Sequence, residues 1–414
     1  MRPAGATVEL AGKRLGRAPP VDGHAGSGLR AAGVRRDRVL CCLVVACYWA
    51  AIYLYVPILP VYARSLGASM TGVGLVVGAY GFSQVLIRVP LGIASDRWGR
   101  RHPFVWAGVF AAGLGALGLA FAPSAEWLVF WRAVAGVAAA TYVAAIALFA
   151  GYFPAAETPR AVGLLSFVTG VAQLAATTVG GRIADGFGWQ APFLAAGAVA
   201  LPGLLLARAI DEPRLERTPP PLSRLARIAV VPSLLVASLA AALVQFTAWA
   251  TTYAFVPIYA DGLGASRTAL GLLTAASLGP YTLATLAVAP LMARWGPRSV
   301  SAVGLALLAA SAAVVPGLTS VGWVAVAQAV SGLGRGLAST VLMAESIRAV
   351  APAERGTAMG VFNAAIAVGM FLGPATAGLT TDALGLTGAF LASGAAALLG
   401  ALLAAGFVGR SVRA

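Results

Sequence analysis

Residues 92–101 read Gly92-Ile93-Ala94-Ser95-Asp96-Arg97-Trp98-Gly99-Arg100-Arg101 and separate two long apolar runs. The turn holds one aspartate and three arginines beside its glycines. Arginine and lysine concentrate in the short loops that stay on the cytoplasmic side of a membrane. The segment is therefore predicted to be a tight cytoplasmic loop between two membrane-spanning helices.

Composition points to a membrane protein along the whole chain. Of the 414 residues, 59% are hydrophobic and 10% are charged, whereas soluble domains carry about 25% charged residues. The net charge of +15 would suit nucleic acid, but the arginines lie in short loops between apolar runs rather than on one basic face. We expect the lipid bilayer as a partner and no nucleic acid.

The apolar runs define the predicted fold. A helix needs about 20 predominantly apolar residues to cross a bilayer core. Twelve such runs are present, approximately at 39–63, 71–95, 103–122, 127–150, 160–181, 189–208, 229–260, 268–293, 299–318, 322–346, 356–380 and 386–408. The predicted class is an all-α membrane protein with 12 transmembrane helices in two pseudo-symmetric six-helix bundles.

The polar segments set the boundaries and the orientation. We expect a disordered cytoplasmic Arg-rich tail at 1–38, bundles at 39–208 and 229–408, a cytoplasmic linker at 209–228 and a cytoplasmic tail at 409–414. A start codon placed too early or a transit peptide are the alternatives for 1–38. With both termini cytoplasmic, the cytoplasmic segments hold 23 of the 29 basic residues, which opposes the reverse orientation.

The two halves repeat each other at a shift of 197 residues. The shift aligns Pro60-Val61-Tyr62 with Pro257-Ile258-Tyr259, and it aligns Asp185 with Asp382. One shift that serves five helices indicates duplication rather than chance similarity between apolar runs.

The pattern G-x3-D-R-x-G-R-R at residues 92–101 resembles motif A of the major facilitator superfamily. The resemblance covers about residues 39–408 and implies a secondary transporter with parallel six-helix halves and a substrate site between them. It implies a conformational latch in which Asp96 meets the start of the eleventh helix near Gly356. The latch residues are Gly92, Asp96, Arg97, Gly99, Arg100 and Arg101.

Three arginines lie inside apolar runs, where each costs about 2.5 kcal/mol or more at the bilayer centre, so each is a functional candidate. Arg132 resembles the motif B arginine that the family links to proton coupling, with helix packing as the alternative. Arg88 either lines the pathway or extends to the cytoplasmic surface. Arg335 lies in Gly332-Leu333-Gly334-Arg335-Gly336, near the middle of the tenth helix, and has a substrate-contacting or a structural role.

The helix interiors hold no clear carboxylate, so the buried arginines favour an anionic solute. Amides and aromatic residues supply the other pathway candidates, although such side chains also join membrane helices to one another. These candidates are Tyr48, Tyr53, Gln84, Gln173, Gln245, Trp249, Tyr281, Gln328 and Asn363.

Helix bending is assigned to the eleventh helix, at Gly369, Gly373 and Pro374, because proline frees a backbone carbonyl and permits a kink. In the family's drug/proton antiporters the comparable Gly-Pro signature lies in the fifth helix. Here the fifth helix keeps only Gly180-Gly181 of it, which weakens the resemblance to an antiporter.

Transport is the leading interpretation. Motif A and Arg132 favour proton-coupled efflux of amphipathic or drug-like compounds by an antiporter, whereas Arg335 favours transport of an organic or lipid-like anion. A non-transporting membrane sensor on the same fold is a further alternative. No ATP-binding motif is present, so we expect an ion gradient, with protons first, to drive transport without a cofactor.

The remaining expectations concern chemistry and location. No buried acid pair or catalytic triad is evident, so we expect no enzyme activity. Cys41, Cys42 and Cys47 cluster in one apolar run and are interpreted as apolar filler rather than a metal site. The protein is expected to be a monomer in the plasma (inner) membrane of the cell, and to move a small-molecule substrate.

We expect Asp96→Asn to leave folding intact and to lower the transport turnover, because the neutral side chain interacts more weakly with the helix N-terminus. Turnover in vesicles, together with membrane expression, measures this. Full transport by a stably expressed variant would contradict the assignment of the latch to Asp96.

Overall fold

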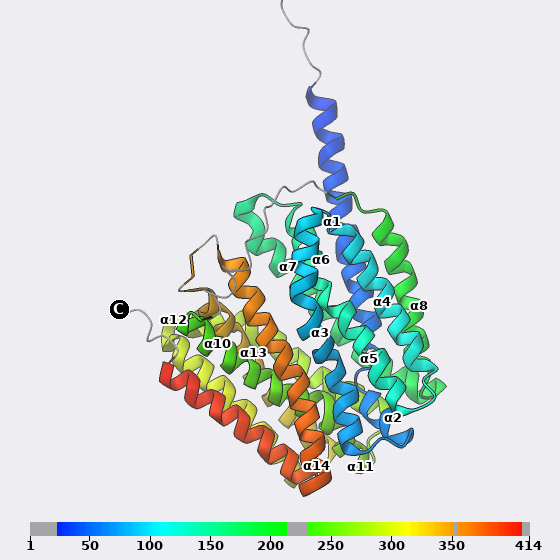
Figure 1. Ribbon diagram of the computed structural model, residues 1–414, viewed down its shortest axis with the longest axis vertical. Coiled ribbons are helices and arrows are strands. Elements are labelled where there is room, and N and C mark those ends of the chain that lie inside the picture. The colour runs from blue at the N-terminus through cyan, green and yellow to red at the C-terminus, as the bar shows by residue number, and fades with distance from the viewer. Residues whose placement is uncertain (1–22, 213–229, 349, 352–353, 408–414) are drawn as a thin grey trace, which may run out of the picture.

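The computed structural model describes residues 23–212, 230–348, 350–351 and 354–407, and within these ranges it contains helices and no strand (Figure 1). The first half comprises α1 (Gly23–Tyr53), α2 (Leu59–Ser65), α3 (Met70–Trp98), α4 (His102–Ala120), α5 (Ala125–Ala140), α6 (Tyr142–Ala150), α7 (Thr158–Phe187) and α8 (Ala191–Arg208). The second half comprises α10 (Pro232–Ala248), the π-helix η2 (Trp249–Phe255), α11 (Val256–Gly262), α12 (Arg267–Val314), α13 (Val321–Arg348) and α14 (Arg355–Phe407). Short 3-10 turns cover Ala155–Glu157 and Val315–Gly317.

The helices account for twelve crossings of a membrane. Eight spans of the described residues are long and apolar enough to cross, and two of these, α12 and α14, contain two helices each. Gly296 and Gly385 separate the paired helices with left-handed φ values of 75° and 74°. The predicted all-α fold is confirmed for the described residues, and α1 and α13, which lie outside these eight spans, make the helices consistent with the predicted 12 crossings.

One expected boundary differs from the structure, and two others fall largely outside the described residues. The segment expected to be a disordered tail, 1–38, is helical from Gly23 onward, whereas its earlier residues lie outside the described part. Residues 23–38 contain no proline, so the membrane helix extends without a break, and Arg38 donates to the carbonyl oxygen of Tyr152. The linker lies mostly outside the described residues, as does the tail at 409–414.

The backbone repeats with the sequence. Among the described residues six glycines adopt a left-handed φ, and they form three pairs separated by the same 197 residues: Gly67 with Gly264, Gly99 with Gly296, and Gly188 with Gly385. Residues with a Cβ rarely adopt this conformation, so each glycine ends a helix or starts a turn at the same place in both halves. The predicted pseudo-symmetry of the two bundles is therefore confirmed.

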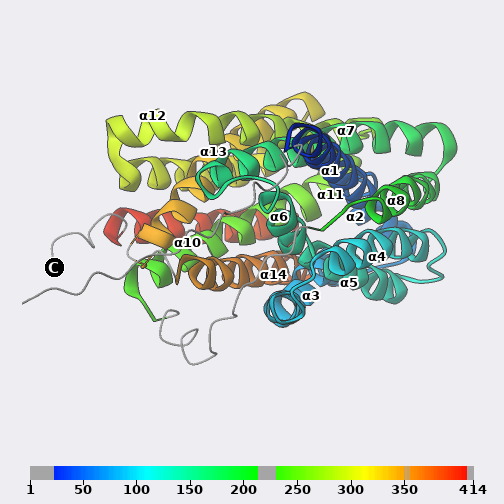
Figure 2. The same ribbon diagram turned by 90° about the horizontal axis from the view of Figure 1, so that it is seen from above.

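The halves meet along two seams, where α3 packs on α14 and α7 packs on α12 (Figure 2). We call the face where α1 begins and α3 ends, with residues 92–101, the terminal face. The face with residues 66–69 and 263–266 is called the opposite face. Close backbone contacts gather toward the opposite face: a Cβ on Gly81 would lie 2.6 Å from the amide nitrogen of Phe371.

Toward the terminal face the same helices separate. A Cβ added at Gly92, Gly163, Gly356 or Gly360 would meet no atom within 4 Å. Figure 1 shows the two groups of helices together near α2 and α11 and diverging toward the end where α1 begins. The structure is therefore closed at the opposite face and more open at the terminal face.

We expect Gly304→Ala to destabilise the second half by roughly 1–3 kcal/mol, because overpacked cores cost about this much. A Cβ on Gly304 would lie 2.7 Å from the carbonyl oxygen of Gly334 and 2.8 Å from the amide nitrogen of Ala338. Thermal unfolding in detergent measures the effect. Gly163→Ala is the matched control, which should be neutral or stabilising because its Cβ meets open space; equal losses in both variants would contradict the packing argument.

Candidate functional site

Arg132 lies in a cage of two tyrosines inside the first half. Helix α5 carries the arginine, which is 1% exposed. Its guanidinium carbon lies 4.3 Å from the ring centre of Tyr80 on α3 and 5.6 Å from that of Tyr55, which follows α1. One terminal nitrogen donates to the Tyr55 hydroxyl at 3.4 Å. Cation–π contact thus replaces an acidic partner for this charge.

Arg335 occupies a similar cage in the second half. Helix α13 carries the arginine, which is 5% exposed. Its guanidinium carbon lies 4.3 Å from the ring centre of Tyr281 on α12 and 5.5 Å from that of Tyr253 in the π-helix. A terminal nitrogen donates to the Tyr253 hydroxyl at 2.9 Å. Gly332, Gly334 and Gly336 pack directly on neighbouring helix backbones, so the space beside these glycines is filled by protein.

The two cages use equivalent helices but staggered positions. In each half the fourth crossing supplies the arginine, and the first and second crossings supply the tyrosines. Arg335 lies six residues beyond Ala329, the repeat equivalent of Arg132, which is about 9 Å along a helix. Because of this stagger the shift of 197 does not align the two arginines. Tyr55, Tyr80 and Tyr253 were not among the residues predicted from the sequence. The signal that could have identified them is that the first two crossings of each half carry tyrosines.

An aromatic bridge joins the cages across the interface between the halves. The rings of Tyr80 and Trp249 stack at 5.0 Å with an interplanar angle of 15°. Trp249 also contacts Tyr253 at 4.8 Å, and Tyr53 meets Tyr253 edge-on at 6.4 Å. Trp249 and Tyr253 both belong to the π-helix η2, an unusual local structure that occurs frequently at functional sites. The contacts of Tyr80 with Trp249 and of Tyr53 with Tyr253 thus join the two halves.

The charges of both arginines lack an acidic counterpart in the described residues. No ion pair joins Arg132 or Arg335 to a carboxylate there, and the Nε atom of each is buried without a hydrogen-bond acceptor. Glu345, near the end of α13, instead pairs with Arg348 at 3.3 Å. A buried guanidinium with an unused donor is a strong site for an anion or a polar oxygen.

Arg88 contacts the other half instead of extending to the surface. Its terminal nitrogen lies 3.4 Å from both the backbone and the side-chain oxygen of Asn363 on α14. Asn363 is held in turn by a 2.8 Å bond to the carbonyl of Met359. The expected alternative, that Arg88 snorkels to the cytoplasmic surface, is therefore wrong, because an acceptor lies within reach across the α3–α14 seam.

The other predicted pathway residues divide into two groups. Tyr53, Trp249 and Tyr281 belong to the cages or the bridge. Gln84 is buried but donates within its own helix to the carbonyl of Tyr80 at 3.1 Å, and Gln328 is buried with its oxygen unpaired. Gln173 and Gln245 are half-buried on α7 and α10.

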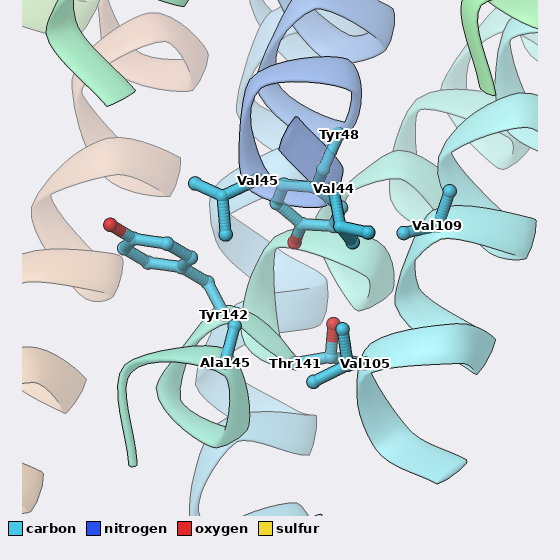
Figure 3. Close-up of a pocket in the computed structure, with 8 residues that line it drawn as sticks. All are labelled: Val44, Val45, Tyr48, Val105, Val109, Thr141, Tyr142 and Ala145. Atoms are coloured by element: carbon cyan, nitrogen blue, oxygen red, sulfur yellow. The ribbon is translucent and has the colours of Figure 1, made fainter. Parts of the chain in front are cut away.

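Tyr48 lines a small cavity within the first half (Figure 3). Its hydroxyl donates to the carbonyl oxygen of Ala138, and its ring stacks on Tyr142 at 6.3 Å. The cavity has a volume of about 10 Å³, which suffices for about one water molecule. Tyr48 is therefore a packing residue here, and the cavity is too small for an organic solute.

The motif A loop lies at the terminal face. Arg97, Gly99 and Arg100 are exposed, Gly92 borders open space, and the side chain of Asp96 lies outside the described part of the structure. The loop is anchored from the end of the first half. Glu212 accepts hydrogen bonds from the backbone N–H groups of Arg101 and His102, the latter at 3.2 Å. This carboxylate stabilises the start of α4.

The residues assigned to bending are points of close packing. Gly369 and Gly373 of α14 lie against the backbone of α10 at Ala242 and Phe246. Pro374 presents its carbonyl oxygen to Gly74 of α3, across the seam between the halves. Their role in bending stays a prediction.

Two equivalent six-helix halves that close at one face and share a buried cationic and aromatic site define a multi-pass membrane transporter rather than an enzyme. A family model for the Major Facilitator Superfamily matches residues 41–258 and again residues 237–414. The chain belongs to the Major Facilitator Superfamily.

Individual relatives resemble the chain over different lengths. The multi-drug resistance efflux pump PmrA of Streptococcus pneumoniae is 34% identical over 153 residues, which cover 36% of this chain and 38% of that protein. The chain thus matches about two fifths of that relative. An uncharacterized MFS-type transporter from Methanocaldococcus jannaschii is 22% identical over 358 residues, covering 81% of this chain and 88% of the relative.

Solved structures share the fold at low sequence identity. A bacterial homologue of the human lysosomal transporter Spinster, in an inward-facing and unoccupied conformation, superposes with a TM-score of 0.77 at 16% identity, covering 90% of this chain and 96% of the other. The nucleoside transporter NupG superposes with a TM-score of 0.69 at 14% identity, covering 90% and 98%. These similarities establish the fold.

We expect Tyr253→Phe to lower the unfolding free energy by about 1–3 kcal/mol, because it removes the acceptor of a charged buried donor. Tyr55→Phe is the matched variant and should cost less than half as much, since its hydrogen bond to Arg132 is long at 3.4 Å. Thermal unfolding of both variants measures the difference. A larger loss for Tyr55→Phe would contradict this order.

Proposed function

We propose that the protein is a secondary transporter that moves an amphipathic organic anion across the plasma membrane by alternating access. One observation carries the proposal: two buried guanidinium groups, Arg132 and Arg335, lie in aromatic cages with no carboxylate partner among the described residues. An anionic group that reaches them gains charge-assisted hydrogen bonds, and the surrounding rings accept its apolar part.

The orientation of the proposed cycle follows from charge. The terminal face carries the exposed arginines of the 92–101 loop, and the positive-inside bias supports a cytoplasmic position for this face, where α1 begins and α14 ends. The described conformation, closed at the opposite face, is then the inward-facing one. An anion from the cytoplasm reaches the arginines when the bridge between Tyr80 and Trp249 parts.

Proton-coupled efflux of drug-like compounds is the second candidate. Its support is the similarity to multidrug efflux pumps such as PmrA, together with the motif A loop. No carboxylate contacts the two cages within the described residues, so a coupling proton would require a group elsewhere. This is why we place the anion first.

The deciding experiment is thermal stabilisation of the purified protein by three groups of compounds: small organic anions, lipid-like anions and lipophilic cations. A ligand that binds only the folded state at 100 times its Kd adds roughly 2.7 kcal/mol of stability. We expect an anion to stabilise the parent and Arg294→Gln, whose arginine is exposed on the terminal face, and to fail with Arg335→Gln. Arg335→Gln should lose the stabilisation because glutamine lacks the positive charge that binds the anion.

The opposite pattern would assign a different substrate. Stabilisation by lipophilic cations alone, equal in the parent and in Arg335→Gln, would make Arg335 a structural residue and support drug efflux. Equal stabilisation of both proteins by an anion would place the anion site elsewhere.

A further inference from the structure

We propose that Asp185 and Asp382 form two equivalent latches that hold the opposite face of the transporter shut. Each aspartate lies at the end of a helix in one half and binds the first backbone N–H groups of a helix in the other half. The proposal concerns the conformational cycle and does not depend on which solute the protein carries.

The first latch crosses the α3–α14 seam. Asp382 of α14 accepts a hydrogen bond from the backbone N–H of Met70 at 3.2 Å and from that of Thr71 at 2.8 Å. The Thr71 hydroxyl donates to the same carboxylate at 2.7 Å. Met70 and Thr71 are the first two residues of α3, so the carboxylate also meets the positive end of the helix dipole.

The second latch repeats this geometry across the α7–α12 seam. Asp185 of α7 accepts from the backbone N–H of Arg267 at 3.0 Å and from that of Thr268 at 2.8 Å. Arg267 and Thr268 are the first two residues of α12. The capped residues of the two latches are 197 positions apart, and so are the two aspartates. In each latch the aspartate comes from one half and the capped helix from the other.

The helix ends are built to leave these donors for the other half. The third N–H of each helix binds the side chain of its own N-cap serine, from Gly72 to Ser69 at 3.0 Å and from Ala269 to Ser266 at 3.1 Å. The first two N–H groups have no partner inside the helix. Only an acceptor from outside can satisfy them, and the aspartate of the opposite half supplies it.

Glycines bring each aspartate within reach. Gly181 and Gly378 precede Asp185 and Asp382 by one turn, and a Cβ on either would overlap or crowd the backbone at the start of the partner helix. For Gly378 the added atom would lie 2.6 Å from the carbonyl oxygen of Met70. On each helix the glycine that allows close packing and the aspartate that accepts the hydrogen bonds therefore lie on the same face.

Arg267 adds a further contact to the second latch. Its guanidinium donates to the carbonyl oxygen of Ala184 at 2.7 Å and lies 4.0 Å from the ring centre of Trp189. Both partners belong to the first half. Opening of the opposite face therefore breaks this contact together with both carboxylate caps.

The test measures opening directly, with spin labels on the two halves at the opposite face. Phe121→Cys and Thr319→Cys provide exposed labelling sites in a full-length chain whose three native cysteines are replaced by serine. Asp185→Asn, Asp382→Asn and the double variant are compared with Asp261→Asn, an exposed aspartate of the same face outside the latches. Asparagine keeps the size and removes the charge.

We expect a single short distance between the labels in the parent and in Asp261→Asn. Each latch variant should raise the ratio of the long-distance to the short-distance population by roughly five- to tenfold, and the double variant by about the product of the two. The measurement requires no substrate. A negative result would therefore count against the latches and not against the anion proposal.

A distance distribution in the folded double variant that matches Asp261→Asn would overturn the proposal. A second measurement needs no variant: amide hydrogen exchange of the parent. The first two amides of a helix normally lack an internal partner, so slow exchange at Met70, Thr71, Arg267 and Thr268 supports the latches. The first turn of α5 is the reference, because the side chain of its N-cap residue makes no capping hydrogen bond. Exchange at the four latch amides as fast as in that turn would overturn the proposal.

Discussion

Close approach of helix backbones along two seams is the constraint on which this structure depends. In a bilayer, lipid tails are as apolar as side chains, so helices associate through packing and hydrogen bonds rather than through the hydrophobic effect. Here glycines such as Gly74, Gly81 and Gly271 remove the Cβ atoms that would hold α3 from α14 and α7 from α12. The absence of such contacts beside Gly92 and Gly356 leaves the terminal face open. The same two seams are therefore tightly packed toward the opposite face and loosely packed at the terminal face.

The buried charges depend on this arrangement as well. Arginine is costly inside a membrane protein, and Arg132 and Arg335 are held by tyrosine rings from two other helices of the same half rather than by acids. The stacked pair of Tyr80 and Trp249 then connects the cages between halves. Because each half encloses its own arginine, the halves can move as units, and the aromatic contacts between them are the ones that change. This division suits a transporter that works by rocking of two rigid bundles.

Sequence reasoning recovered the features that depend on local composition or on the repeat. Apolar runs predicted the helices, and the shift of 197 residues aligned glycines such as Gly99 and Gly296, which share a left-handed φ in the structure. It was wrong about residues 23–38, where the helix extends beyond the apolar run, and of its two alternatives for Arg88 the extension to the surface does not hold, because Arg88 contacts Asn363. Trp249 and Tyr281 were identified as candidates from residue type alone. Their partners Tyr80 and Arg335 could not be paired with them, because the cages are staggered by more than one helical turn between the halves.

The sequence alone determined the membrane class, the duplication, the family resemblance of residues 92–101 and the presence of arginines in apolar runs. Each of these follows from residue type, order or spacing along the chain. Tertiary structure alone decided which side chains meet. Asp382 caps Thr71, a residue 311 positions earlier, and Arg335 binds Tyr253, which is 82 positions earlier. Such contacts depend on the rotation and stagger of whole helices against one another, and local periodicity carries no record of either.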